Sequence, residues 1–79
     1  MEKKPRPKDT LSDILDVVSW LHVANDYFSK SVSWFYQRMD ERDVNGYGKP
    51  ARFTDEQREE LRGALYDIAE RIRQAADKL

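Results

Sequence analysis

The chain has 79 residues, of which 37% are charged and 39% hydrophobic, with no cysteine, one histidine and a formal net charge of −1. This length allows one small domain, and the lack of cysteine excludes disulfides and thiolate metal sites. No apolar run could span a membrane, and none follows the basic start as a secretory signal requires. We therefore expect a cytoplasmic protein with no metal, no cofactor and no small-molecule substrate.

Positive charge is concentrated at the start and in the middle of the chain. Residues 1–8 sum to +3, residues 9–26 to −4, residues 27–53 to +2 and residues 54–79 to −2. Residues 1–8, MEKKPRPK, hold four cations and two prolines with nothing apolar after Met1. This composition predicts a disordered basic tail, which either solubilises the protein or touches phosphates. Residues 9–79 are expected to form a single helical domain.

A first helical region is expected from about Thr10. Thr10 and Asp13 form a T-x-x-D capping pattern, and acidic residues are favoured in the first turn of a helix. Two apolar rows at helical spacing predict a wide buried face. The rows are Leu11, Ile14, Leu15, Val18 and Leu21, and Val17, Trp20, Ala24 and Phe28. The periodicity leaves open whether residues 10–28 form one helix or two helices that break near Trp20.

A second helix is expected after Ser29-Lys30-Ser31, because either serine can cap it. Its buried stripe is Val32, Phe35, Tyr36 and Met39, and its end is expected near Arg42. Trp34 points away from this stripe. It is therefore either an exposed contact surface or a residue that the C-terminal helix covers.

Residues 43–53, DVNGYGKPARF, have the composition of a loop, because asparagine and glycine permit positive φ and Pro50 interrupts a helix. Val44, Tyr47 and Phe53 either pin this loop to the core or pair as a short extended piece.

The last helix is the clearest element of the sequence. Thr54 and Gln57 form a capping box, and Asp67 with Arg71 gives a favourable i, i+4 pair. The apolar residues that follow repeat as a heptad-like seam, namely Leu61, Leu65, Ile68, Ile72, Ala75 and Leu79. A helix over 55–78 spans about 36 Å at 1.5 Å per residue. That length is large for so small a domain, so part of it either covers the other helices or meets a second copy.

Catalytic machinery is not recognisable. His22 is the only imidazole, and no nucleophile motif accompanies it. The carboxylates fall on the polar faces of the predicted helices, without the paired cleft that acid–base chemistry needs. We therefore expect no enzyme.

The segment Trp20–Met39 suggests a helix-turn-helix-like pair. Ala24 is small enough for a second helix to cross closely, the turn is polar, and the second helix has a partly basic outer face. Its DNA contacts would be Lys30 and Ser31 at phosphates, Ser33 and Gln37 at base edges, and Arg38 at either. Three features weigh against this interpretation: the turn lacks glycine, it is one or two residues too long, and carboxylates follow at Asp40, Glu41 and Asp43.

The alternative is a homo-oligomeric protein-interaction module that binds no nucleic acid. Its contact surface would be Trp34, the seam that includes Leu61, Leu65, Ile68 and Ile72, or both.

The run YFSKSVSWFYQRM, followed by VNG and then GKPARFT, resembles a family of short bacterial proteins classed as a domain of unknown function. The likeness covers roughly residues 20–70. It implies a compact helical fold of helix-turn-helix-like type and brings no established activity. This chain departs from the family pattern at Val32, where a cation is common, at Ser29, where glycine is common, and at the inserted Tyr47-Gly48.

The sequence thus predicts an all-α fold of three to four helices, with a helix-turn-helix-like pair and a long C-terminal amphipathic helix. The favoured function is a small DNA-contacting or regulatory module that works alone or as a homodimer.

Overall fold

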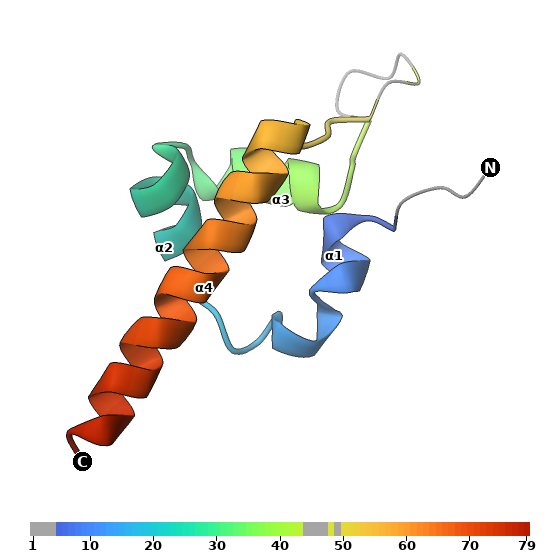
Figure 1. Ribbon diagram of the computed structural model, residues 1–79. Helices are drawn as coiled ribbons and strands as arrows, with labels where there is room; N and C mark the ends of the chain where they lie inside the picture. Colours follow the sequence, from blue (N-terminus) through green and yellow to red (C-terminus); the bar gives the residue numbers. More distant parts are fainter. Residues whose placement is uncertain (1–4, 44–47, 49) are drawn as a thin grey trace.

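The computed structural model describes residues 5–43, 48 and 50–79 (Figure 1). These residues are helical with no strand, which confirms the predicted fold class. The elements in order are α1 (Pro7–Thr10), the 3₁₀ turn η1 (Ser12–Ile14), α2 (Trp20–His22), the π-helical segment η2 (Val23–Tyr27), α3 (Val32–Met39) and α4 (Asp55–Asp77). The predicted contacts of Val44 and Tyr47 lie outside the described residues.

The first helical region breaks at Ser19, so residues 10–28 do not form one continuous helix. The Ser19 hydroxyl accepts a hydrogen bond from the backbone N–H of His22 at 3.3 Å and caps α2. Before the break the chain forms only α1 and η1. The predicted cap at Thr10 is wrong, because Thr10 is the last residue of α1.

The break also changes which apolar residues are buried. Val17 and Leu21 are 72% and 57% exposed, contrary to the two predicted rows, because one continuous helical register does not run through Ser19. In the helical segment that begins after Ser19, Trp20, Val23 and Ala24 lie on one face, and all three are buried. Val23 is the core residue that the uninterrupted rows missed.

The core is built around stacked aromatic rings from three separate segments. The ring of Phe35 in α3 lies 5.8 Å from that of Trp20 in α2 and 5.3 Å from that of Phe53, which precedes α4. Phe53 is buried, so this last residue of the predicted loop is fixed in the core. Met39 and Leu61 complete the cluster from α3 and α4.

Helix α3 begins where the sequence places it and ends earlier. The Ser31 hydroxyl accepts a hydrogen bond from the N–H of Trp34 at 3.1 Å, as expected for a capping serine. The helix ends at Met39 rather than near Arg42, because Glu41 takes a positive φ of 51° and the N–H of Arg42 turns back to the Gln37 carbonyl. Tyr36, predicted to be buried, is exposed.

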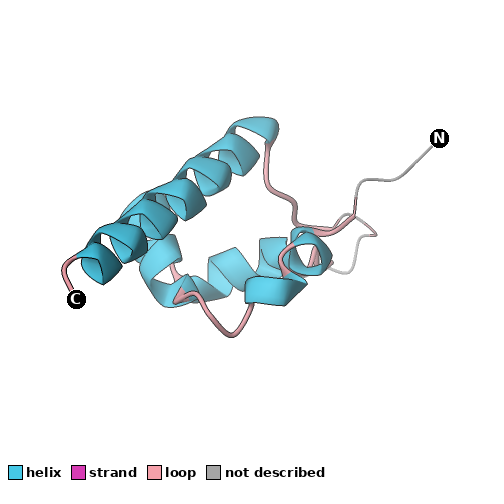
Figure 2. Ribbon diagram, turned by 60° about the horizontal axis from the view of Figure 1, so that its bottom comes forward, coloured by secondary structure: helices cyan, strands magenta, loops and turns pink. Residues whose placement is uncertain are grey.

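Helix α4 forms a layer on one side of the shorter helices (Figure 2). Both bonds of its capping box are present: Thr54 Oγ1 accepts from the Gln57 N–H at 3.1 Å, and Gln57 Oε1 accepts from the Thr54 N–H at 2.9 Å. Its first half packs on the core through Leu61 and Ala64. Residues 69–79 are all exposed, and this end of the helix extends past the rest of the molecule (Figure 1).

Replacement of Thr54 by alanine is expected to lower the free energy of unfolding by about 1 kcal/mol, because one capping acceptor is lost at the start of the longest helix. Urea unfolding followed by circular dichroism measures this change. Thr54→Ser retains the hydroxyl and should stay close to wild type. Equal stabilities for the alanine and serine variants would show that the cap does not hold α4 in place.

Candidate functional site

The five residues predicted to contact DNA lie along one side of α3 and the turn before it. Lys30, Ser31 and Ser33 are exposed, and Gln37 and Arg38 are half-buried. Residues three or four positions apart share a helix face. Ser33 therefore lies beside Gln37, on the side opposite the buried Phe35 and Met39.

Trp34 is half-buried, so it is neither the fully exposed contact residue nor the fully covered residue that the sequence left as alternatives. One side of its ring contacts Phe28 and Phe53, with ring centroids 5.8 Å apart in each case. Two cations lie over the ring: the Arg38 guanidinium is 4.4 Å from the centroid and the Lys30 ammonium 5.8 Å. Each contact of this kind contributes roughly 0.5–1 kcal/mol at an exposed site. Trp34 therefore positions the two cations and also joins α3 to the core.

The turn between η2 and α3 uses a serine where a glycine is usual. Ser29 has a positive φ of 55°, and the N–H of Lys30 donates to the Ala24 carbonyl, six residues earlier, at 2.9 Å. The Asn25 side-chain amide donates to the Lys30 carbonyl at 3.0 Å. The preceding segment η2 is π-helical, so its backbone hydrogen bonds span one residue more than those of an α-helix. Ala24 is fully buried beneath the turn.

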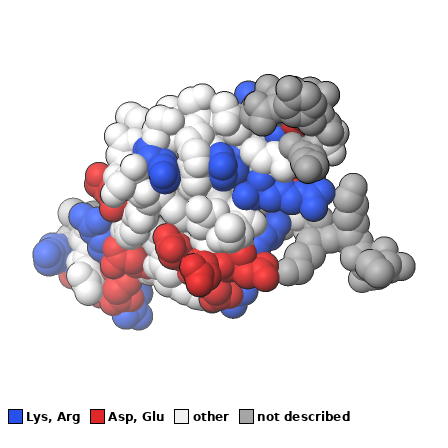
Figure 3. All heavy atoms as spheres, turned by 90° about the horizontal axis from the view of Figure 1, so that it is seen from above, with Lys and Arg blue, Asp and Glu red and all other residues white. Residues whose placement is uncertain are grey.

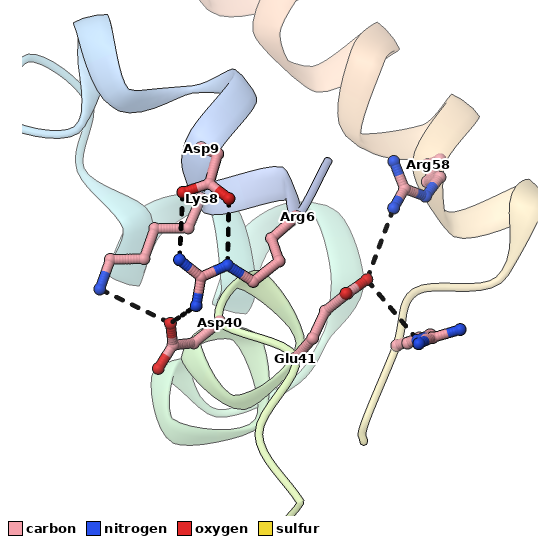
Figure 4. Close-up of polar contacts among 7 residues, drawn as sticks. Arg6, Lys8, Asp9, Asp40, Glu41 and Arg58 are labelled. Atoms are coloured by element: carbon pink, nitrogen blue, oxygen red, sulfur yellow. Dashed lines mark hydrogen bonds and ion pairs between the residues drawn. The ribbon is translucent and has the colours of Figure 1, made fainter. Parts of the chain in front are cut away.

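The acidic end of α3 is paired with cations. Asp40 accepts a hydrogen bond from Arg6 at 3.2 Å and one from Arg42 at 3.0 Å, and the Lys8 ammonium lies 3.6 Å away (Figure 4). Arg6 also binds Asp9 through two hydrogen bonds. Arg6 and Lys8 therefore hold α1 against the end of α3 instead of forming a free basic arm.

Glu41 is held from the other side. Its carboxylate lies 3.7 Å from a guanidinium nitrogen of Arg58 in α4 and 3.9 Å from one of Arg52 (Figure 4). The carboxylates of Asp40 and Glu41, which counted against DNA contact in the sequence, are thus both compensated by cations from other segments. Sequence spacing could not show this pairing, since the partners lie up to 34 residues away.

The predicted seam on α4 divides into two halves. Leu61 is buried, and Leu65 and Ile68 pack against the core as half-buried residues. Ile72 is 59% exposed, and Leu79 is fully exposed. The interaction surface predicted from the heptad pattern is therefore core in its first part and free surface in its second.

The middle of α4 is tied to η2 by a hydrogen bond that the sequence did not predict. The Tyr27 hydroxyl donates to the carboxylate of Asp67, the residue expected to pair with Arg71. This bond is the main cause of a raised pKa for Tyr27. It fixes the point beyond which α4 runs free of the core.

No described helix has the length and apolar character to cross a membrane. Within residues 5–43, 48 and 50–79 no three histidine, cysteine or carboxylate side chains form a metal cluster. His22 forms a surface pair with Asp26, with Nδ1 and carboxylate oxygen 2.7 Å apart.

The sequence profile of a domain of unknown function, DUF5053, matches residues 7–79. The chain belongs to DUF5053. The resemblance seen in the YFSKSVSWFYQRM and GKPARFT segments is thereby confirmed as membership of a family of unknown function. No curated protein and no solved structure matches the chain.

The DUF5053 match begins at Pro7, which is also the first residue of α1 and is buried. Pro7 and Lys8 thus lie in a helix, two residues ahead of the boundary expected at residue 9. Within the described part of this segment, Pro7 begins a helix, and Arg6 and Lys8 are partners of Asp40.

The DUF5053 fold is expected to lose stability in acid through Asp40 and Asp9. The hydrogen bond from Arg42 lowers the pKa of Asp40, and that from Arg6 lowers the pKa of Asp9. A carboxylate whose pKa is depressed on folding stabilises the fold above its unfolded pKa of about 3.9. That contribution is lost as the pH falls through the folded pKa.

Asp40→Asn should therefore lower stability at pH 7 and flatten the fall in stability below about pH 4. Urea unfolding at a series of pH values measures both effects. Glu60→Gln, a change at an exposed carboxylate of α4, is the control. If the two variants show the same pH dependence, the Asp40 pairs do not hold α1 to α3.

Proposed function

We propose that this DUF5053 chain is a small DNA-contacting module that uses the exposed face of α3. The observation that carries the proposal is that Ser33 and Gln37 share one side of a capped helix, with Lys30 in the turn before it and Arg38 held over the neighbouring Trp34 ring. Side chains of these types bind phosphates and base edges in the major groove.

The approach of α3 to the preceding helix supports this use. Ala24 is fully buried, and the Ser29 turn redirects the chain into α3. A small residue in the first helix and a polar turn after it are two features that let a helix-turn-helix present its second helix to DNA, although the turn here is longer than usual.

The local charge supports it as well. Residues 27–53 sum to +2 although the whole chain is at −1. On the face seen in Figure 3, a band of Lys and Arg side chains lies above a patch of Asp and Glu, so charges of the two signs are separated over much of this face. Since Asp40 and Glu41 are paired with cations, they repel a phosphate less than free carboxylates would.

Each residue has a distinct role in the proposal. Lys30 and the first N–H groups of α3 face phosphate, since the start of a helix carries free donors and partial positive charge. Ser31 acts indirectly, because its hydroxyl oxygen already caps α3. Ser33 and Gln37 reach base edges. Arg38, stacked on Trp34, has an orientation fixed before DNA arrives.

The dissociation constant for DNA is expected to be micromolar at low salt and to rise steeply towards physiological salt. Binding releases the salt cations condensed on the duplex, and a higher salt concentration opposes that release. Lys30→Ala should reduce the salt slope by about 1, as expected for one lost phosphate contact. Arg38→Ala should weaken binding more, because it also removes the cation stacked on Trp34. Fluorescence anisotropy of a labelled duplex measures both.

Arg73→Ala is the matched control, because it removes one cation from the far half of α4 and leaves α3 untouched. Circular dichroism must show that each variant is folded. Equal losses of affinity for Arg73→Ala and Lys30→Ala would mean that only total charge matters. That result would exclude α3 as the contact surface.

A further inference from the structure

The exposed half of α4 carries an apolar row that is open to solvent. Ile72 lies on the same helix face as Leu61 and Leu65, with Ala76 beside it, and Leu79 follows just after the end of the helix. Every residue from 69 to 79 is exposed. A helix end that buries no side chain gains little stability from its own propensity, so a partner along this row would stabilise it.

A groove of about 830 Å³ lies at the other end of this row, between α1 and the first half of α4. Pro7 and Leu11 line the α1 side. Leu65, Tyr66 and Ala69 line the α4 side, so the groove opens directly onto the row that Ile72 continues. One chain therefore carries both a groove with apolar residues in its lining and a protruding helix end with an apolar row, and both lie on α4.

The charges along α4 favour one orientation for a second helix. Residues 55–68 hold five carboxylates and two arginines, net −3, whereas residues 69–79 hold three cations and two carboxylates, net +1. An antiparallel pair places each negative half against a positive half and opposes the two helix dipoles. A parallel pair places the two negative halves together and the two positive halves together, and aligns the two helix dipoles.

We propose that the occupant of this groove is a second copy of the chain. Two α4 helices pair antiparallel about a two-fold axis, and the Ile72–Leu79 row of each copy lies in the α1–α4 groove of the other. The interface is isologous, so one surface supplies both the row and the groove. The proposal does not depend on whether α3 contacts DNA.

The expected dimer is reversible and weak. The accessible part of the row, from Leu65 to Ala76, is about 17 Å long at 1.5 Å per residue. Contacts at this small end of the interface range are mostly transient. We expect a dissociation constant between about 1 and 100 μM.

Sedimentation velocity of the full chain from about 2 to 500 μM tests the proposal. Wild type should shift from monomer to dimer across this range. Ile72→Glu should stay monomeric at every concentration, since it buries a charge in the interface. Because Ile72 is 59% exposed in the single chain, this variant should keep its helical circular dichroism signal.

Gln74→Glu is the control, since it adds the same charge two residues away on the opposite face of α4 and should dimerise like wild type. A chain that stays monomeric to 500 μM overturns the proposal. So does a dimer that Ile72→Glu leaves intact. Binding of an apolar dye such as anilinonaphthalene sulfonate by a persistent monomer would assign the groove to a small ligand instead.

The orientation has its own test, because the chain has no native cysteine. Arg62→Cys and Ala76→Cys place thiols near opposite ends of the row. Mixed under oxidised glutathione, the two variants should form the mixed disulfide in preference to either symmetric one. Preferential symmetric disulfides would show parallel helices and overturn the antiparallel arrangement. The DNA affinity of Ile72→Glu is measured at a protein concentration below the dimer dissociation constant. This measurement separates a failure of the dimer proposal from a failure of the DNA contact at α3.

Discussion

The contact of Phe35 with Trp20 and Phe53 is the interaction on which the rest of the structure depends. It joins α3, α2 and the segment before α4, which are remote in sequence, and Phe35 has no exposed surface. Aromatic pairs of this kind contribute roughly 0.5–1.5 kcal/mol each beyond the burial of their area. In a chain without disulfides or metal clusters in its described part, these rings replace the staples that small domains otherwise use.

This core also determines which side of α3 faces outwards. With Phe35 and Met39 fixed inside, Ser33 is exposed and Gln37 half-buried on the opposite side, and Trp34 lies at the boundary with Arg38 over its ring. The ion pairs at Asp40 and Glu41 then attach α1 and α4 to the far end of the same helix. Core, charge pairing and candidate site are therefore consequences of how a single eight-residue helix is held.

Features encoded within a few residues were predictable from the sequence, and features that depend on distant partners were not. The Thr54–Gln57 capping box, the Ser31 cap and the outward face of α3 follow from local spacing. The sequence does not decide whether the helix breaks at Ser19, because apolar rows at helical spacing continue across this residue. The pairing of Asp40 with Arg6, and that of Tyr27 with Asp67, required the fold, since each joins residues more than thirty positions apart. The π-helical turn was visible only as a turn of unusual length.

The most direct test of the account is an NMR titration of the ¹⁵N-labelled chain with duplex DNA at low salt. The account predicts that amide shifts concentrate at residues 30–38 and leave the exposed half of α4 unchanged. Shifts confined to α4, or no shifts at DNA concentrations of about 100 μM, which exceed the expected micromolar dissociation constant, would contradict the assignment of α3 as the contact surface.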